Sequence, residues 1–265
     1  MATKKLKKLA VVVSGWHFPV AFYEVLAGNY IPKGWTVDLF VVSHRNPIFA
    51  VMPAVDTKTQ RGRMDAILYR ELATKEKIEK LGFNYKEYPN TVGDWGNTNQ
   101  WLEDNDYKKY DLFLFTHDDN LLLRNDMFKV VCEEIYPDKD DWLIITNSIG
   151  TPPGSIRGSF EFFKKEMLDI LGGKFDLTEV TLDRTGETEN PKDWGDLFNW
   201  NATVYPLSDL LAKNDLWSKV RILSSIYRVS IFCIEGERGL ISNTQRQNTA
   251  QEDAGLTWLE EQGII

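Results

Sequence analysis

The sequence predicts an α/β protein in which helices flank a mostly parallel central sheet within a single domain. Three observations support this: paired apolar runs with a helical segment between them, an acidic pair directly after a later apolar run, and a chain without internal repeats. Residues 9–14 and 36–43 are mainly apolar, as is typical of strands buried on both faces. Between them, apolar residues recur at helical spacing before Gly28. A strand, a helix and a strand within about 35 residues form a βαβ unit, whose strands pair in parallel.

The rest of the chain continues this pattern. The further predicted elements are strands at 83–88, 111–116, 142–146 and 229–234, and helices at 64–81, 126–135 and 208–219. Residues 91–99 are rich in Gly, Asn and Trp, which predicts a polar loop. Apolar residues at helical spacing from Phe160 to Leu171 predict a helix that begins at Ser159 and ends at Gly172-Gly173.

One domain is predicted for residues 1–240, because 265 residues suffice for a large core and no linker interrupts the pattern. Residues 241–265 form a polar tail, which is either a mobile lid over a bound ligand or an unstructured terminus. Cys132 and Cys233 fit no metal-binding spacing, so we interpret them as buried free thiols of a cytoplasmic protein.

The net charge of −8 and the pI near 5.1 disfavour nucleic acid as a partner. No stretch approaches the ~18 apolar residues of a transmembrane helix. The lysines of residues 4–8 allow peripheral contact with a membrane surface, although a solvated tail explains them equally simply. An anionic ligand of this acidic chain requires a bridging cation or a local basic pocket.

An acidic pair, Asp118-Asp119, follows the apolar run 111–116 and His117. In open α/β sheets, ligands bind beyond the carboxyl ends of the strands. Two carboxylates on a tight turn suit one hard divalent cation, which in turn binds substrate phosphates. We therefore predict that Asp118 and Asp119 bind Mn²⁺ or Mg²⁺. The other acidic pair, Asp140-Asp141, precedes a predicted strand and is interpreted as a solvated turn.

The sequence from about residue 8 to 200 resembles the GT-A-fold glycosyltransferases, especially family 2-like enzymes. Residues 110–120 are similar to the strand that leads to the DXD motif of that family, here in an X-Asp-Asp form. Asn97-Thr-Asn-Gln-Trp101 is similar to their Asn-bearing helix entry, and 157–175 to their acceptor-side segment. The resemblance implies a Rossmann-like GT-A fold, with Asp119 on the metal and Asp118 nearer the ribose or sugar.

The resemblance also implies a nucleotide site that Ser14, Ser43 and Asn97 help to form. Family 2 enzymes usually have an Asp after the second strand to read the base, whereas this chain has Ser43-His44-Arg45. Arg63, at the head of a predicted helix, is a candidate to bind a diphosphate, with a solvated basic turn as the alternative.

The resemblance implies that the chain transfers a sugar, with inversion in the family's manner, from a nucleotide-sugar donor to a carbohydrate or other hydroxyl acceptor. The Glu-Asp pair that carries the family's catalytic base is replaced by Asp193-Trp-Gly-Asp196. We favour Asp196 as the base, with Asp193 in reserve and a helix N-cap as the alternative role of Asp196. Trp95 or Trp194 is predicted to stack on a sugar, unless it packs in the core.

Two other functions compete with glycosyl transfer. A sugar-phosphate nucleotidyltransferase uses a related fold, but usually has a basic, Gly-rich loop after the first strand. Here residues 14–18 contain neither Lys nor Arg. A non-catalytic protein that binds a nucleotide or carbohydrate on the same fold is the other alternative, supported by the missing Glu-Asp pair.

Overall fold

The protein is described here from a computed structural model. It describes residues 5–15, 17–44, 66–88, 93–118, 120, 122, 125–137, 141–146, 160–177, 207–208, 210–222, 233–234 and 238–239. For residues 44, 93–94, 222, 233–234 and 238–239 it describes the backbone alone.

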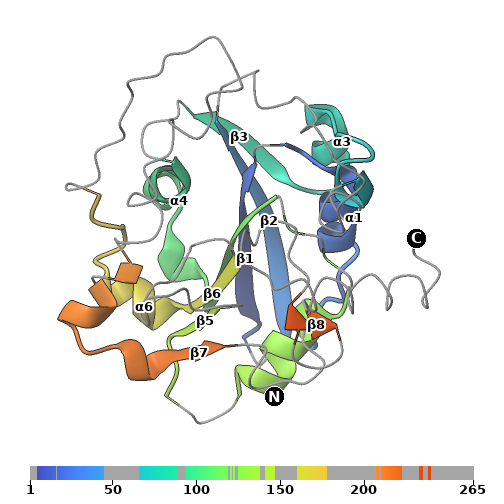
Figure 1. Cartoon of the computed structure of the whole chain (residues 1–265). Helices are drawn as coiled ribbons and strands as arrows, with labels where there is room; N and C mark the ends of the chain where they lie inside the picture. The colour runs from blue at the N-terminus through green and yellow to red at the C-terminus, as the bar shows by residue number, and fades with distance from the viewer. Residues whose placement is uncertain are drawn as a thin grey trace.

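A seven-stranded sheet forms the centre of the molecule, in the order β3-β2-β1-β4-β6-β5-β7 (Figure 1). Its strands are β1 (Lys7–Gly15), β2 (Trp35–His44), β3 (Asn84–Tyr88), β4 (Leu112–His117), β5 (Ile144–Thr146), β6 (Phe160–Lys164) and β7 (Val220–Ile222). Neighbouring strands are parallel except at β6, which runs antiparallel to both β4 and β5. A separate two-stranded sheet pairs β8 (Cys233–Ile234) with β9 (Arg238–Gly239). The predicted α/β class with a mostly parallel sheet is therefore confirmed.

Helices cover both faces of the large sheet (Figure 1). One face packs against α1 (Val20–Ala27), α3 (Lys75–Lys80), α5 (Met127–Lys129) and the π-helical segment η3 (Val130–Ile135). The other packs against α4 (Gly93–Asp104) and α6 (Lys165–Ile170). Two short 3₁₀ helices are η2 (Tyr107–Lys109) and η5 (Trp217–Lys219).

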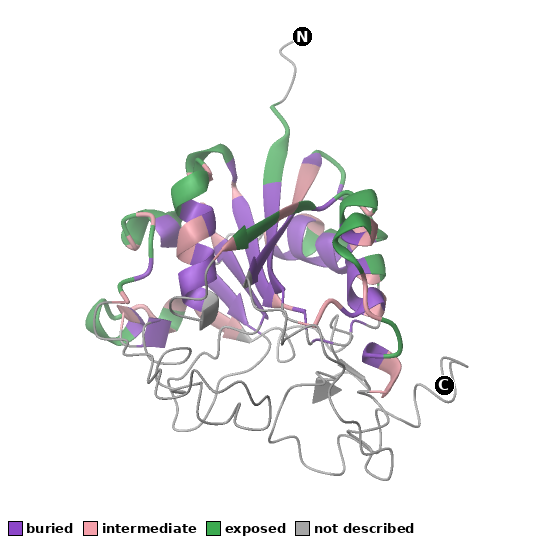
Figure 2. Ribbon diagram, turned by 90° about the horizontal axis from the view of Figure 1, so that it is seen from above, coloured by how far each residue is buried: buried purple, intermediate pink, exposed green. Residues whose placement is uncertain are grey.

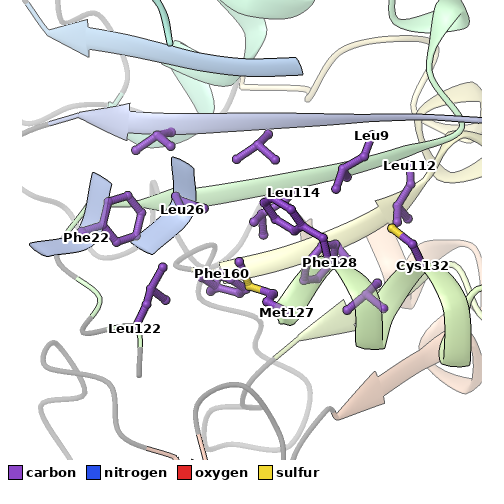
Figure 3. Packing of buried hydrophobic residues seen from close by; sticks show 14 of the residues in the cluster. Leu9, Phe22, Leu26, Leu112, Leu114, Leu122, Met127, Phe128, Cys132 and Phe160 are labelled. Carbon is purple, nitrogen blue, oxygen red and sulfur yellow. The ribbon is translucent and has the colours of Figure 1, made fainter. Parts of the chain in front are cut away.

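The side chains of β1 divide between two apolar cores, because successive residues of a strand point to opposite faces. Leu9, Val11 and Val13 join the core beneath α1 and α5, and Figure 3 shows Leu9 there with Leu112 and Leu114 of β4. Ala10 and Val12 join the core beneath α4 and α6. The central strands are accordingly buried, whereas the edge strand β3, the start of β1 and the outer helix surfaces are largely exposed (Figure 2).

The helix predicted from Ser159 to Gly172 is wrong in its first half. Phe160–Lys164 is strand β6, and α6 begins only at Lys165. Phe160 and Phe162 enter one core and Phe163 enters the other, so this segment is buried on both faces. Backbone pairing with β4 and β5 satisfies the hydrogen bonds of this segment, and it overrides the helical spacing of the apolar residues.

The polar loop predicted at residues 91–99 is also corrected. Helix α4 begins at Gly93, because Trp95, Trp101 and Leu102 together form an apolar stripe that packs on the sheet. The polar residues between them obscured this stripe in the sequence.

Candidate functional site

The carboxyl ends of β1 and β4 lie side by side at one edge of the sheet. Ser14 pairs with His117 in the parallel register, and Gly15 pairs with Ser43 of β2. From β1 the sheet continues through β2 and β3 on one side, and through β4, β6, β5 and β7 on the other. Open α/β sheets bind ligands where the strand order reverses in this way. This edge is therefore the candidate functional site.

Asp118 directly follows β4, and its side chain is completely buried at this edge. Its Oδ2 accepts hydrogen bonds from the backbone N–H of Phe18 at 2.7 Å and of His17 at 3.1 Å. The same oxygen accepts a third bond from the hydroxyl of Tyr23 at 3.2 Å. Oδ1 lies 3.3 Å from the His17 nitrogen. The carboxylate thus connects the end of β4 to the turn between β1 and α1.

The turn between β1 and α1 has a backbone conformation that its own residues do not favour. Phe18 has a φ of 56°, in the left-handed region, which costs a bulky residue about 1–3 kcal/mol. Gly15 is required by close packing, since a Cβ there would lie 2.7 Å from Phe18 Cε1 and 3.0 Å from Val41 Cγ1. The Phe18 ring also stacks with Tyr23 at a centroid distance of 6.3 Å. The turn is therefore fixed by its surroundings rather than by local preference.

Two tyrosines near this edge remain protonated well above neutral pH. Burial raises the pKa of Tyr23 well above 10.0, and the adjacent Asp118 carboxylate raises it further. Burial raises the pKa of Tyr85 to about 12, an effect opposed by its hydrogen bond with Ser43 and increased by the charge of Glu87. Both phenols therefore act as neutral hydrogen-bond donors at this edge.

Four of the predicted site residues meet at this edge. Ser14 and Ser43 are buried near the ends of β1 and β2. Asn97 on α4 is also buried, and its amide donates a hydrogen bond of 3.5 Å to the carbonyl of Val42 in β2. With Asp118 they lie close to the point where the strand order reverses. Their predicted contact with a nucleotide stays a prediction.

The other predicted site residues, Asp119, Arg63, Asp193 and Asp196, lie outside the described residues. The same applies to Trp194 and to the tail 241–265. Their roles as metal ligand, diphosphate-binding group, catalytic base, sugar platform and lid remain predictions.

In the part of the chain that the structure describes, no three His, Cys, Asp or Glu side chains form a group able to hold a metal ion. The Asp118 carboxylate accepts bonds from His17, Phe18 and Tyr23, chiefly through Oδ2, and its predicted role as a metal ligand stays a prediction. Hard cations such as Mg²⁺, however, often take only one or two protein carboxylates and complete their shell with substrate phosphates and water. A cation held by Asp119, substrate phosphate oxygens and water would be a site of this kind.

Trp95 is not placed to stack on a sugar, which corrects that prediction. Its side chain is 1% exposed, and its ring centroid lies 4.2 Å from that of Phe175 in the core beneath α4. Asn99 pairs with the same residue, donating to its carbonyl at 2.9 Å and accepting from its N–H at 2.8 Å. Trp95 and Asn99 together fix the segment that follows α6.

Sequence reasoning missed Tyr23 as a residue of the site. It lies next to Phe22 on the buried face of α1. A tyrosine on a buried helix face usually finds a hydrogen-bond partner. A tyrosine on the buried face of α1 therefore predicts a hydrogen-bond acceptor beneath this helix, but the sequence does not show that the acceptor is Asp118.

No protein family matches the sequence, and no curated protein matches it. Among solved structures, a cytidylyltransferase from Leptospira borgpetersenii aligns over 63% of this chain and 64% of its own, with 12% identity and a TM-score of 0.37. TarS from S. aureus, in complex with UDP, aligns over 64% of this chain and 50% of its own, with 14% identity and a TM-score of 0.39.

A third similar structure is 4-diphosphocytidyl-2C-methyl-D-erythritol synthase from Anaerococcus prevotii. It aligns over 96% of both chains, with 13% identity and a TM-score of 0.42. The chain thus spans about half of the TarS 1-349 chain and under two thirds of the Leptospira chain. At these identities and TM-scores the alignments assign neither a family nor an activity.

None of the described helices has both the length and the apolar composition that crossing a membrane requires.

Proposed function

We propose that the protein is a metal-dependent glycosyltransferase that moves a sugar from a nucleotide-sugar donor to a carbohydrate or other hydroxyl acceptor. The observation that supports this most is the hydrogen bonding of the backbone amides in the turn after β1. In nucleotide-binding sheets, the first βα turn commonly binds phosphate through its backbone amides. Here the amides of His17 and Phe18 donate to Asp118 instead.

The described ends of the strands around this turn carry no Lys or Arg that could replace those amides. The last two residues of each strand from β1 to β4 are Ser14-Gly15, Ser43-His44, Glu87-Tyr88 and Thr116-His117. Among these described residues there is no Lys or Arg, and the chain carries a net charge of −8. A diphosphate at this edge would therefore meet repulsion unless a divalent cation accompanied it.

In this proposal Asp119 binds Mn²⁺ or Mg²⁺, and Ser14, Ser43 and Asn97 border the nucleoside. The metal neutralises the nucleoside diphosphate that leaves when the sugar is transferred. Arg63 is the candidate for an additional diphosphate contact. Asp196, with Asp193 in reserve, is proposed as the base that removes the proton of the acceptor hydroxyl.

Isothermal titration calorimetry with UDP, GDP, CDP and their sugars, with and without Mn²⁺, tests the proposal. We expect Asp119→Ala to weaken metal-dependent nucleotide-sugar binding at least tenfold. The matched control is Asp141→Ala in the other acidic pair, where the exposed Asp141 forms an ion pair with Lys219. This control should bind as the wild type does, and a wild type that binds no nucleotide would refute the proposal.

Product analysis then separates the competing functions. A glycosyltransferase releases nucleoside diphosphate from a nucleotide-sugar, whereas a nucleotidyltransferase joins a sugar phosphate to the α-phosphate of a nucleoside triphosphate and releases pyrophosphate. Release of pyrophosphate alone would replace glycosyl transfer with nucleotidyl transfer. Binding without either product would indicate a non-catalytic protein on the same fold.

A further inference from the structure

Asp118 and the turn it contacts are distant in sequence but adjacent in space. The hydrogen bonds from His17 and Phe18 span 101 and 100 residues, and the bond from Tyr23 spans 95. They join the end of β4 to the turn after β1 and to α1, across the point where the strand order reverses. We propose that Asp118 is a positioning residue, which fixes the turn between β1 and α1, and that it is not a ligand of the metal.

The hydrogen-bond geometry supports a structural role for Asp118, chiefly through its Oδ2. Oδ2 accepts three bonds of 2.7, 3.1 and 3.2 Å, and Oδ1 lies within 3.3 Å of the same His17 N–H. A buried carboxylate is stable only where such donors replace the water that it loses. Moving Oδ2 of Asp118 onto a cation would leave two part-buried backbone amides and a buried phenol to find other acceptors.

The conformation of the turn supplies the reason for this arrangement. Phe18 adopts a φ of 56°, which a bulky residue adopts only when its surroundings impose it. Its N–H makes the shortest of the bonds to Asp118, at 2.7 Å, so the carboxylate acts on the residue whose backbone is least favourable. Gly15 allows the Phe18 ring to lie against the end of β1, where a Cβ would approach it to 2.7 Å.

The two residues of the acidic pair then have different tasks. This step rests on the proposed function: Asp118 sets the shape of the turn beside which a nucleotide would bind, and Asp119 alone supplies a carboxylate to the cation. The role of Asp118 in the turn does not depend on any ligand.

Amide hydrogen exchange of His17 and Phe18 in the full chain tests the positioning role without a nucleotide. We expect both amides to be protected in the wild type and to exchange about tenfold faster or more in Asp118→Asn. Asp38→Asn is the matched control, because Asp38 also accepts a tyrosine hydroxyl, that of Tyr110 at 2.9 Å, but on β2 and away from the turn. The control should leave the exchange of His17 and Phe18 unchanged.

Unchanged exchange of both amides in a folded Asp118→Asn would overturn the proposal. If that variant does not fold, the test uses the wild type alone. Hydrogen exchange of the His17 and Phe18 amides is then measured with and without Mn²⁺. Protection that persists in saturating Mn²⁺ supports a carboxylate that stays on the turn, whereas faster exchange with Mn²⁺ means that it moves to the metal and contradicts the proposal. If only the proposed glycosyltransferase function is wrong, the protein will not bind nucleotides, but the His17 and Phe18 amides will still be protected from exchange.

Discussion

The hydroxyl of Tyr23 donates a 3.2 Å hydrogen bond to Oδ2 of Asp118, and both side chains are completely buried. This bond joins α1 to the end of β4, two elements that the sheet alone would not connect. Burial and the neighbouring carboxylate both disfavour the ionised phenol, so the pKa of Tyr23 is raised well above 10.0. The folded state therefore binds the Tyr23 proton more tightly than the unfolded chain does.

The first prediction concerns alkaline pH. Because the folded pKa of Tyr23 exceeds the unfolded value of 10.0, its contribution is fully present below pH 10 and is lost as the pH rises toward the folded pKa. The free energy of unfolding, from urea titrations followed by tryptophan fluorescence, should therefore fall as the pH rises above about 10. The fall should be smaller in Tyr23→Phe than in the wild type.

The exposed Tyr30 provides the control for that experiment, since Tyr30→Phe should keep the wild-type pH dependence. Tyr85, with a pKa raised to about 12, accounts for part of the loss that remains in Tyr23→Phe. An equal loss of stability in the wild type and Tyr23→Phe would show that Tyr23 does not contribute.

The second prediction is that Trp95→Ala unfolds the protein more easily without a specific effect on sugar binding. Removing a fully buried indole should lower the free energy of unfolding by about 3–5 kcal/mol, because the cavity beneath α4 fills only partly. Trp217→Ala, at a half-buried position, should cost less. A folded Trp95→Ala of normal stability that has lost sugar affinity would restore the stacking role.

A third prediction concerns the space at Gly15. Its Cβ in Gly15→Ala would lie 2.7 Å from Phe18 Cε1, 3.0 Å from Val41 Cγ1 and 3.1 Å from the Tyr23 hydroxyl. Such overpacking should lower the free energy of unfolding by about 1–3 kcal/mol. In a double-mutant cycle, adding Phe18→Leu should recover part of this loss, because leucine lacks the Cε1 atom that makes the nearest contact. Fully additive effects would mean that the Phe18 ring is not the obstacle.

The fourth prediction concerns the thiol of Cys132. It is a buried residue of η3, and this burial raises its pKa far above the ordinary value of 9.0. Thiolate is the reactive form, so Cys132 should react with DTNB only as fast as the protein unfolds. Measuring the rate in a Cys233→Ser background isolates this thiol, and rapid reaction of the native protein would contradict its burial.

The sequence by itself determined the elements whose signals are local. The apolar runs of β1, β2 and β4 predict strands buried on both faces, and the structure places them together in the parallel part of the sheet. The helical spacing before Gly28 likewise predicts α1, which ends at Ala27. The sequence also predicts that Asp118 lies at a strand end, because this prediction requires only that the apolar run before it can be recognised.

Tertiary structure decided the features that depend on contacts between distant residues. The apolar residues from Phe160 onward have helical spacing, but β6 forms there because it pairs with β4 and β5. Its side chains are also buried in the cores on both faces of the sheet. Trp95 became a core residue only because α4 packs on the sheet. Asp118 faces the amides of His17 and Phe18 because β1 and β4 are neighbours, and about 100 intervening residues hide that contact from any local pattern.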